Sequence, residues 1–117
     1  MKIAIVSGVG PTDGLGAQLG VRFAKEGLHV LVAGRTEEKL EAVVADIKAQ
    51  GGSAEGIVAD ATDEAATEDL FARAGDQLEL AIYNTGNNTP GRIVDMSAEF
   101  FANSWQVCCF GGFLFGR

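Results

Sequence analysis

The first sixteen residues constrain the fold of this chain more than any other segment. A short apolar run over residues 3–6 leads into a stretch with four glycines, and a helical pattern begins at Ala17. A strand, a glycine-rich turn and a helix in this order let the backbone approach a pyrophosphate closely and offer it free helix N–H groups. This segment therefore predicts a nucleotide site, with the candidate residues Gly8, Gly10, Thr12, Gly14, Leu15 and Gly16.

The rest of the chain alternates between strand and helix patterns. Apolar runs predict strands over 29–33, 54–59 and 78–83, and helical periodicity predicts helices over 17–26, 36–50, from 62 or 63 to 74, and from about 97. Short right-handed crossovers between such elements produce a parallel sheet covered by helices on both faces. We predict an α/β fold of one domain, residues 1–117: a three-layer, Rossmann-like half of a doubly wound sheet with strand order 3-2-1-4.

The end of the second predicted strand indicates which dinucleotide is bound. A free ribose 2′-hydroxyl usually meets an acidic residue at this place, but here Gly34 is followed by Arg35 and Thr36. A guanidinium and a hydroxyl suit a 2′-phosphate, which favours NADP over NAD. The alternative is that Arg35 is an exposed side chain on an ordinary loop.

Two more strands end at the same predicted edge of the sheet. Asp60 and Ala61 follow the third strand, where a carboxylate can accept a hydrogen bond from an adenine amino group. Asn84, Thr85 and Gly86 follow the fourth strand, where the nicotinamide-side ribose would lie. The alternatives are a helix N-cap at Asp60 or Thr62 and plain turn chemistry for the Asn84 segment.

Asp13 complicates the predicted phosphate site, because a carboxylate there would repel a phosphate unless its side chain points outward. The alternative to a phosphate-binding role is that Thr12 and Asp13 only cap the helix that starts at Gly14.

Charge and cysteine content narrow the possible partners. A net charge of −7 argues against a duplex nucleic acid and against docking on an anionic membrane. The two cysteines, Cys108 and Cys109, are adjacent, which fits neither a zinc site nor a disulfide framework, so we expect no metal. We expect both in an apolar helix as core residues and the chain in the cytoplasm, because residues 1–6 are too short for a signal peptide.

Together these segments resemble the short-chain dehydrogenase/reductase family. The resemblance rests on the glycine-rich turn from Gly8 to Gly16, on Gly34-Arg35, on Asp60-Ala61 and on Asn84-Thr85-Gly86. Either Gly10 is the first of the three family glycines, or Gly8 is and Thr12-Asp13 is a two-residue insertion. The resemblance implies hydride transfer between a nicotinamide and a carbonyl or alcohol.

The catalytic residues of that family are not matched in this sequence. The family uses an Asn in the fourth helix, a Ser, and a Tyr followed four positions later by a Lys. Here Cys108 stands at the Asn position, and the only tyrosine, Tyr83, is followed four positions later by Asn87. The resemblance therefore implies the N-terminal, cofactor-binding half of such an enzyme, ending at Arg117, with no catalytic residue and no activity of its own.

The last helix carries many aromatic residues and is apolar on nearly all sides, and the fourth strand would form an open sheet edge. We expect a homo-oligomer formed through that helix or that edge. Three alternatives to the cofactor-binding half of a reductase stay open. One is a non-catalytic module for dinucleotide binding or dimerisation, and another is a methyltransferase, which Arg35 disfavours. The third is a structural protein whose nucleotide site is vestigial.

Overall fold

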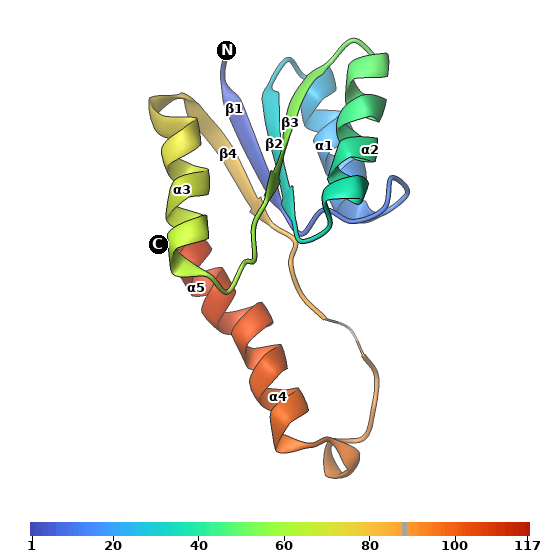
Figure 1. Cartoon of the computed structure of the whole chain (residues 1–117), viewed down its shortest axis with the longest axis vertical. Helices are drawn as coiled ribbons and strands as arrows, with labels where there is room; N and C mark the ends of the chain where they lie inside the picture. Colours follow the sequence, from blue (N-terminus) through green and yellow to red (C-terminus); the bar gives the residue numbers. More distant parts are fainter. Residues whose placement is uncertain (88) are drawn as a thin grey trace.

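The computed structural model describes residues 1–87 and 89–117, and its centre is a four-stranded parallel sheet (Figure 1). The strands lie in the order β3-β2-β1-β4, so the predicted 3-2-1-4 order is confirmed. Their bounds are Ile3–Ser7 for β1, His29–Gly34 for β2, Ser53–Val58 for β3 and Leu78–Tyr83 for β4.

Helices cover both faces of the sheet, which confirms the three-layer arrangement. Figure 1 shows α1 and α2 on one face and α3 and α5 on the other. The helices are α1 (Leu15–Lys25), α2 (Glu37–Ala49), α3 (Glu64–Ala74), α4 (Ala98–Trp105) and α5 (Gly111–Gly116), with short 3-10 turns η1 (Gly75–Gln77) and η2 (Ile93–Asp95) and a π-helical segment η3 (Gln106–Phe110).

The alternation of side chains along β1 and β2 builds one core on each face of the sheet. Ala4, Val6 and Val32 pack against α1 and α2, whereas Ile5 and Leu31 pack against α3 and α5. All five are at most 1 % exposed. Burial on both faces explains why these strands are almost continuously apolar, and it holds their carboxyl ends together at one edge.

The C-terminal helical segment lies partly beyond the sheet. It runs without a break through α4, η3 and α5, but no residue of α4 is buried by the described chain, and Figure 1 shows α4 extending beyond the sheet. Only α5 reaches the core, through Leu114 and Phe115. The expectation that Cys108 and Cys109 are core residues is wrong: both are exposed, because η3 lies before the point where the helix meets the sheet.

No helix in residues 1–87 and 89–117 is both long enough and apolar enough to cross a membrane.

Two glycines with positive φ allow a test of the packing at the sheet edge. Gly8 has a φ of 85°, and a Cβ there would lie 2.6 Å from the Asn84 carbonyl carbon, whereas Gly27 has a φ of 91° with no other described atom within 4 Å of its Cβ position. We expect Gly27→Ala to cost about 1 kcal/mol of unfolding free energy, from backbone strain alone. Gly8→Ala should cost more than about 3 kcal/mol, because a steric overlap is added. Equal losses of unfolding free energy in the two variants, measured by denaturant titration, would contradict this.

Candidate functional site

A cleft of about 230 Å³ lies at the carboxyl ends of the strands. This is the edge where ligands bind in open α/β sheets. Predicted site residues from all four strand ends line this cleft: Gly8, Gly10, Arg35, Thr36, Asp60, Ala61, Asn84, Thr85 and Gly86. The predicted residues that lie outside its lining all belong to the end of the glycine-rich turn and the start of α1: Thr12, Gly14, Leu15 and Gly16.

The start of the glycine-rich turn is packed tightly against the neighbouring strands. The backbone amides of Gly8 and Val9 both donate to the Ala33 carbonyl, at 3.0 and 2.9 Å, and the Asn84 side-chain amide donates to the Gly8 carbonyl at 3.3 Å. A Cβ at Gly16 would lie 2.7 Å from that same carbonyl oxygen. These contacts leave no room for side chains where the turn crosses between β1 and β4.

Gly10 has the opposite environment. It lines the cleft, and no other described atom would come within 4 Å of a Cβ placed there. Bare backbone thus faces open space at this position, so a ligand can approach it closely. Of the two possible alignments with the family glycines, the geometry favours the one with Gly8 first, because Gly8 has the left-handed φ and the close contacts.

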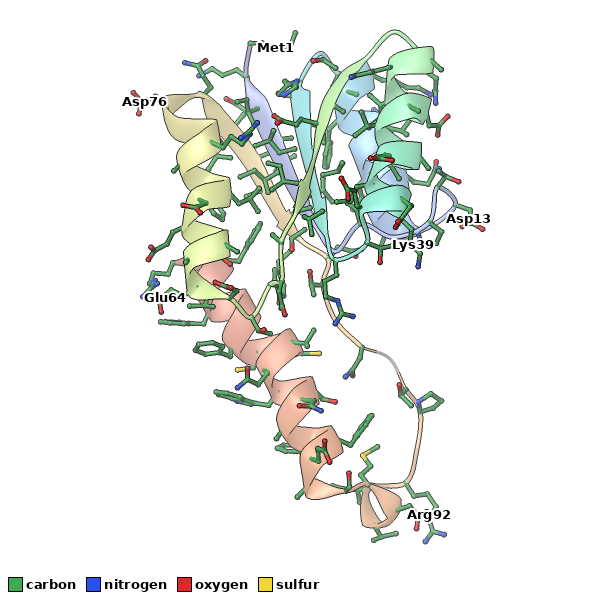
Figure 2. All side chains as sticks on the ribbon, in the orientation of Figure 1. Met1, Asp13, Lys39, Glu64, Asp76 and Arg92 are labelled. Atoms are coloured by element: carbon green, nitrogen blue, oxygen red, sulfur yellow. The ribbon has the colours of Figure 1, made fainter. Side chains whose placement is uncertain are left out.

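Thr12 and Asp13 lie in a turn outside the cleft. The Gly14 amide donates to the Pro11 carbonyl at 2.9 Å, and the Gln18 side-chain amide donates to the Thr12 carbonyl at 2.8 Å. The N-cap of α1 is Gly14, and within the described residues no side chain caps this helix, so the alternative that Thr12 and Asp13 cap it is wrong. Asp13 is exposed and projects outward in Figure 2, away from the cleft.

The β2 end of the cleft is positively charged. Lys39, in the first turn of α2 (Figure 2), lines it together with Arg35 and Thr36. Sequence reasoning missed Lys39, although its position four residues after Arg35 could have indicated it. Neither cation takes part in any of the ion pairs found among the described residues. Thr36 is the N-cap of α2, but within the described chain its side chain makes no cap hydrogen bond.

Asp60 holds the loop after β3 in shape. Its Oδ1 accepts hydrogen bonds from the Thr62 amide at 2.9 Å and from the Thr62 hydroxyl at 2.8 Å. These two bonds, with a smaller contribution from the nearby Arg35 charge, lower the pKa of the Asp60 carboxyl below its usual value. The side chain is therefore ionised at neutral pH. The N-cap of α3 is Asp63, which accepts from the Ala66 amide, so the capping alternative for Asp60 and Thr62 is wrong.

The β4 end of the cleft combines strand ends with a helix. The hydroxyls of Ser7 and Thr85 lie 2.8 Å apart and join β1 to the turn after β4. Val107, from η3, closes the lining on this side. Sequence reasoning missed Ser7 and Val107, and no local pattern could have placed Val107 here, because only the tertiary packing of η3 brings it to the cleft.

The described residues contain no group of three or more His, Cys, Asp or Glu side chains that could hold a metal ion.

Comparison with known proteins identifies the family. The sequence matches the family described as short chain dehydrogenase over residues 2–117. The chain belongs to the short-chain dehydrogenase family. Its fold agrees with solved members: a short-chain dehydrogenase from Rhodopseudomonas palustris is 30 % identical with a TM-score of 0.85, and the match covers 99 % of this chain and 54 % of that one. An F189W variant of actinorhodin polyketide ketoreductase with NADPH is 25 % identical with a TM-score of 0.89, and the match covers 98 % of this chain and 44 % of that one.

The curated relatives that this chain matches are longer than the chain. A 3beta-hydroxysteroid dehydrogenase of Mediterraneibacter gnavus is 38 % identical over 88 residues, which are 73 % of this chain and 31 % of the relative. A 2,3-dihydro-2,3-dihydroxybenzoate dehydrogenase of Bacillus subtilis is 31 % identical over 115 residues, which are 96 % of this chain and 43 % of the relative. The chain therefore spans less than half the length of these relatives.

Proposed function

We propose that this chain binds a nicotinamide dinucleotide in the cleft at the carboxyl edge and prefers NADP(H) to NAD(H). The observation that carries the proposal is the arrangement of the cleft, with bare backbone at Gly10 and two cations, Arg35 and Lys39, at the β2 end. In a chain of net charge −7, two cations in one cleft favour an anionic ligand there. The similarity to a ketoreductase solved with NADPH supports the same ligand class.

Each part of the cleft suits one part of the dinucleotide. The turn at Gly8 and Gly10 can accommodate the pyrophosphate, and the positive end of the α1 dipole would attract its negative charge. Arg35, Thr36 and Lys39 would hold the 2′-phosphate. Asp60 and Ala61 would contact the adenine, and Asn84, Thr85 and Gly86 the ribose on the nicotinamide side. The remaining candidates would shape the turn without lining the cleft: Thr12, Gly14, Leu15 and Gly16.

We further propose that residues 1–117 act as the cofactor-binding part of an oxidoreductase. A bound nicotinamide would supply hydride transfer to a carbonyl or from an alcohol, and the residues of this chain would bind and orient it. The exposed thiols of Cys108 and Cys109 fit a reducing compartment, so we propose the cytoplasm as the location.

Replacing Arg35 tests the cofactor preference. We expect Arg35→Ala to weaken NADPH binding by roughly tenfold to a hundredfold, because a charge-assisted hydrogen bond to phosphate is lost. NADH binding should change little, since NADH has no 2′-phosphate. Titrations followed by cofactor fluorescence measure both.

Lys48→Ala is the matched control, because Lys48 is also on α2 but lines a different groove, away from the cleft. Equal affinity of the wild-type chain for NADPH and NADH would contradict the preference, and absence of binding of either would contradict the whole proposal.

The isolated chain should bind cofactor without turning it over. The hydroxyl of its only tyrosine, Tyr83, donates a hydrogen bond to a backbone carbonyl, and no lysine stands four residues later. We expect no oxidation of NADPH above background with any carbonyl substrate, measured by absorbance with purified protein. Turnover that scales with protein concentration would contradict this proposal.

We also propose that the chain forms a homo-oligomer. Phe101, Trp105 and Phe113 on α4 and α5 are 65 %, 48 % and 58 % exposed, and the outer edge of β4 pairs with no described strand. Light scattering at micromolar concentration should give a mass above that of one chain. Trp105→Glu should lower that mass if the helix forms the interface, whereas Leu15→Glu, at an exposed apolar residue on α1, should not. A monomeric wild-type chain would contradict the proposal.

A further inference from the structure

Tyr83, the last residue of β4, joins the sheet to the π-helical segment η3. Its hydroxyl donates a hydrogen bond to the main-chain carbonyl of Val107. Its ring packs on the buried Phe115, with ring centroids 5.3 Å apart. The ring is therefore anchored in the core, and the hydroxyl reaches out of the core to one point on η3.

The helix at this point is wound more widely than an α-helix. The Gly111 amide donates to the Gln106 carbonyl, five residues earlier, as in a π-helix. Such segments are rare, and they occur mostly as single turns within α-helices, often at functional sites. The Tyr83 hydroxyl gives the Val107 carbonyl, within this turn, a partner from outside the helix.

Gly111 leaves the space that the Tyr83 hydroxyl occupies. A Cβ at Gly111 would overlap the Tyr83 oxygen and lie 3.0 Å from the Ala61 carbonyl oxygen. A Cβ at Gly112 would only touch the Tyr83 ring, at 3.6 Å, which is an ordinary contact. The partly buried hydroxyl thus lies beside η3 and the start of α5, and close to the loop after β3.

This contact lies directly beside the cleft. Val107 lines the cleft together with Thr85 and Gly86, and a Cβ at Gly86 would lie 3.7 Å from the Cys108 sulfur. The position of η3 therefore sets the width of the cleft at its β4 end. That is the end assigned above to the nicotinamide side of the cofactor, whereas the 2′-phosphate is assigned to the β2 end.

Tyr83 keeps its proton at neutral pH. Burial raises the pKa of its hydroxyl above the usual value, and negative charge on Cys108 and Asp60 would raise it further. A hydrogen bond with the Thr85 side chain lowers the pKa by a smaller amount. The hydroxyl is therefore available as a hydrogen-bond donor to the Val107 carbonyl.

We propose that Tyr83 is a positioning residue for the nicotinamide end of the cleft, because its hydrogen bond to Val107 holds the π-helical wall in place. The inference rests on the proposed cofactor binding and adds a residue to it that acts through another part of the structure. It assigns Tyr83 no contact with the reacting atoms.

Tyr83→Phe tests the inference, because it removes the hydroxyl and keeps the ring packing. We expect NADPH to bind about fivefold more weakly, the effect typical of one lost hydrogen bond. Adenosine 2′,5′-bisphosphate, which lacks the nicotinamide half, should bind with unchanged affinity. Amide hydrogen exchange of the ligand-free chain should become faster at residues 110–112.

Two control pairs separate positioning from a general loss of stability. Thr67 lies on α3, away from the cleft, and its buried hydroxyl donates a hydrogen bond to the Asp63 carbonyl at 3.0 Å. Thr67→Val removes this hydroxyl and should leave NADPH affinity unchanged. Gly111→Ala should weaken NADPH binding more than Gly112→Ala, because only a Cβ at position 111 would overlap the Tyr83 oxygen.

The outcomes distinguish the two proposals. Equal weakening of both ligands in Tyr83→Phe, or unchanged NADPH affinity, would overturn the positioning role while leaving cofactor binding intact. A wild-type chain that binds neither ligand would overturn the proposed function and the positioning role with it. Selective weakening of NADPH with faster exchange at residues 110–112 would support both.

Discussion

The close contact between the glycine-rich turn and the end of β4 is the constraint on which the rest of the site depends. Gly8 can approach Asn84 and Thr85 only because it has no side chain and adopts a positive φ. The Asn84 side chain then binds the Gly8 carbonyl, and Thr85 meets Ser7. With these contacts made, the turn cannot collapse into the space above the sheet, and Gly10 is left facing an open cleft.

Most of the fold could be predicted from local patterns, and the errors have a common cause. Strands buried on both faces are apolar throughout, so their existence and order followed from the sequence and the crossover rule. Whether a given residue caps a helix or lies in the core depends on where the helix begins relative to the sheet. That is why the capping roles of Thr12 and Asp13 were wrong, and why Cys108 and Cys109 proved to be exposed.

The site divides in the same way. The positions of Arg35, Asp60 and Asn84 in the cleft could be predicted, because the carboxyl ends of parallel strands always meet at one edge of the sheet. Lys39 was missed because it belongs to the helix after the strand end, and Val107 because only the path of the C-terminal helical segment brings it to the cleft. The sequence shows Tyr83 only as a strand residue, and the role proposed for it rests on its contact with η3.

Mapping amide chemical shifts during an NADPH titration tests most directly whether the cleft binds the dinucleotide. We expect the largest changes at Gly8, Gly10 and Arg35 and along Asn84 to Gly86. Amides at the opposite edge, such as those of His29 and Ser53, should change little. Saturable changes centred on the opposite edge or on α4, or none at all at millimolar NADPH, would contradict a dinucleotide site at the carboxyl edge.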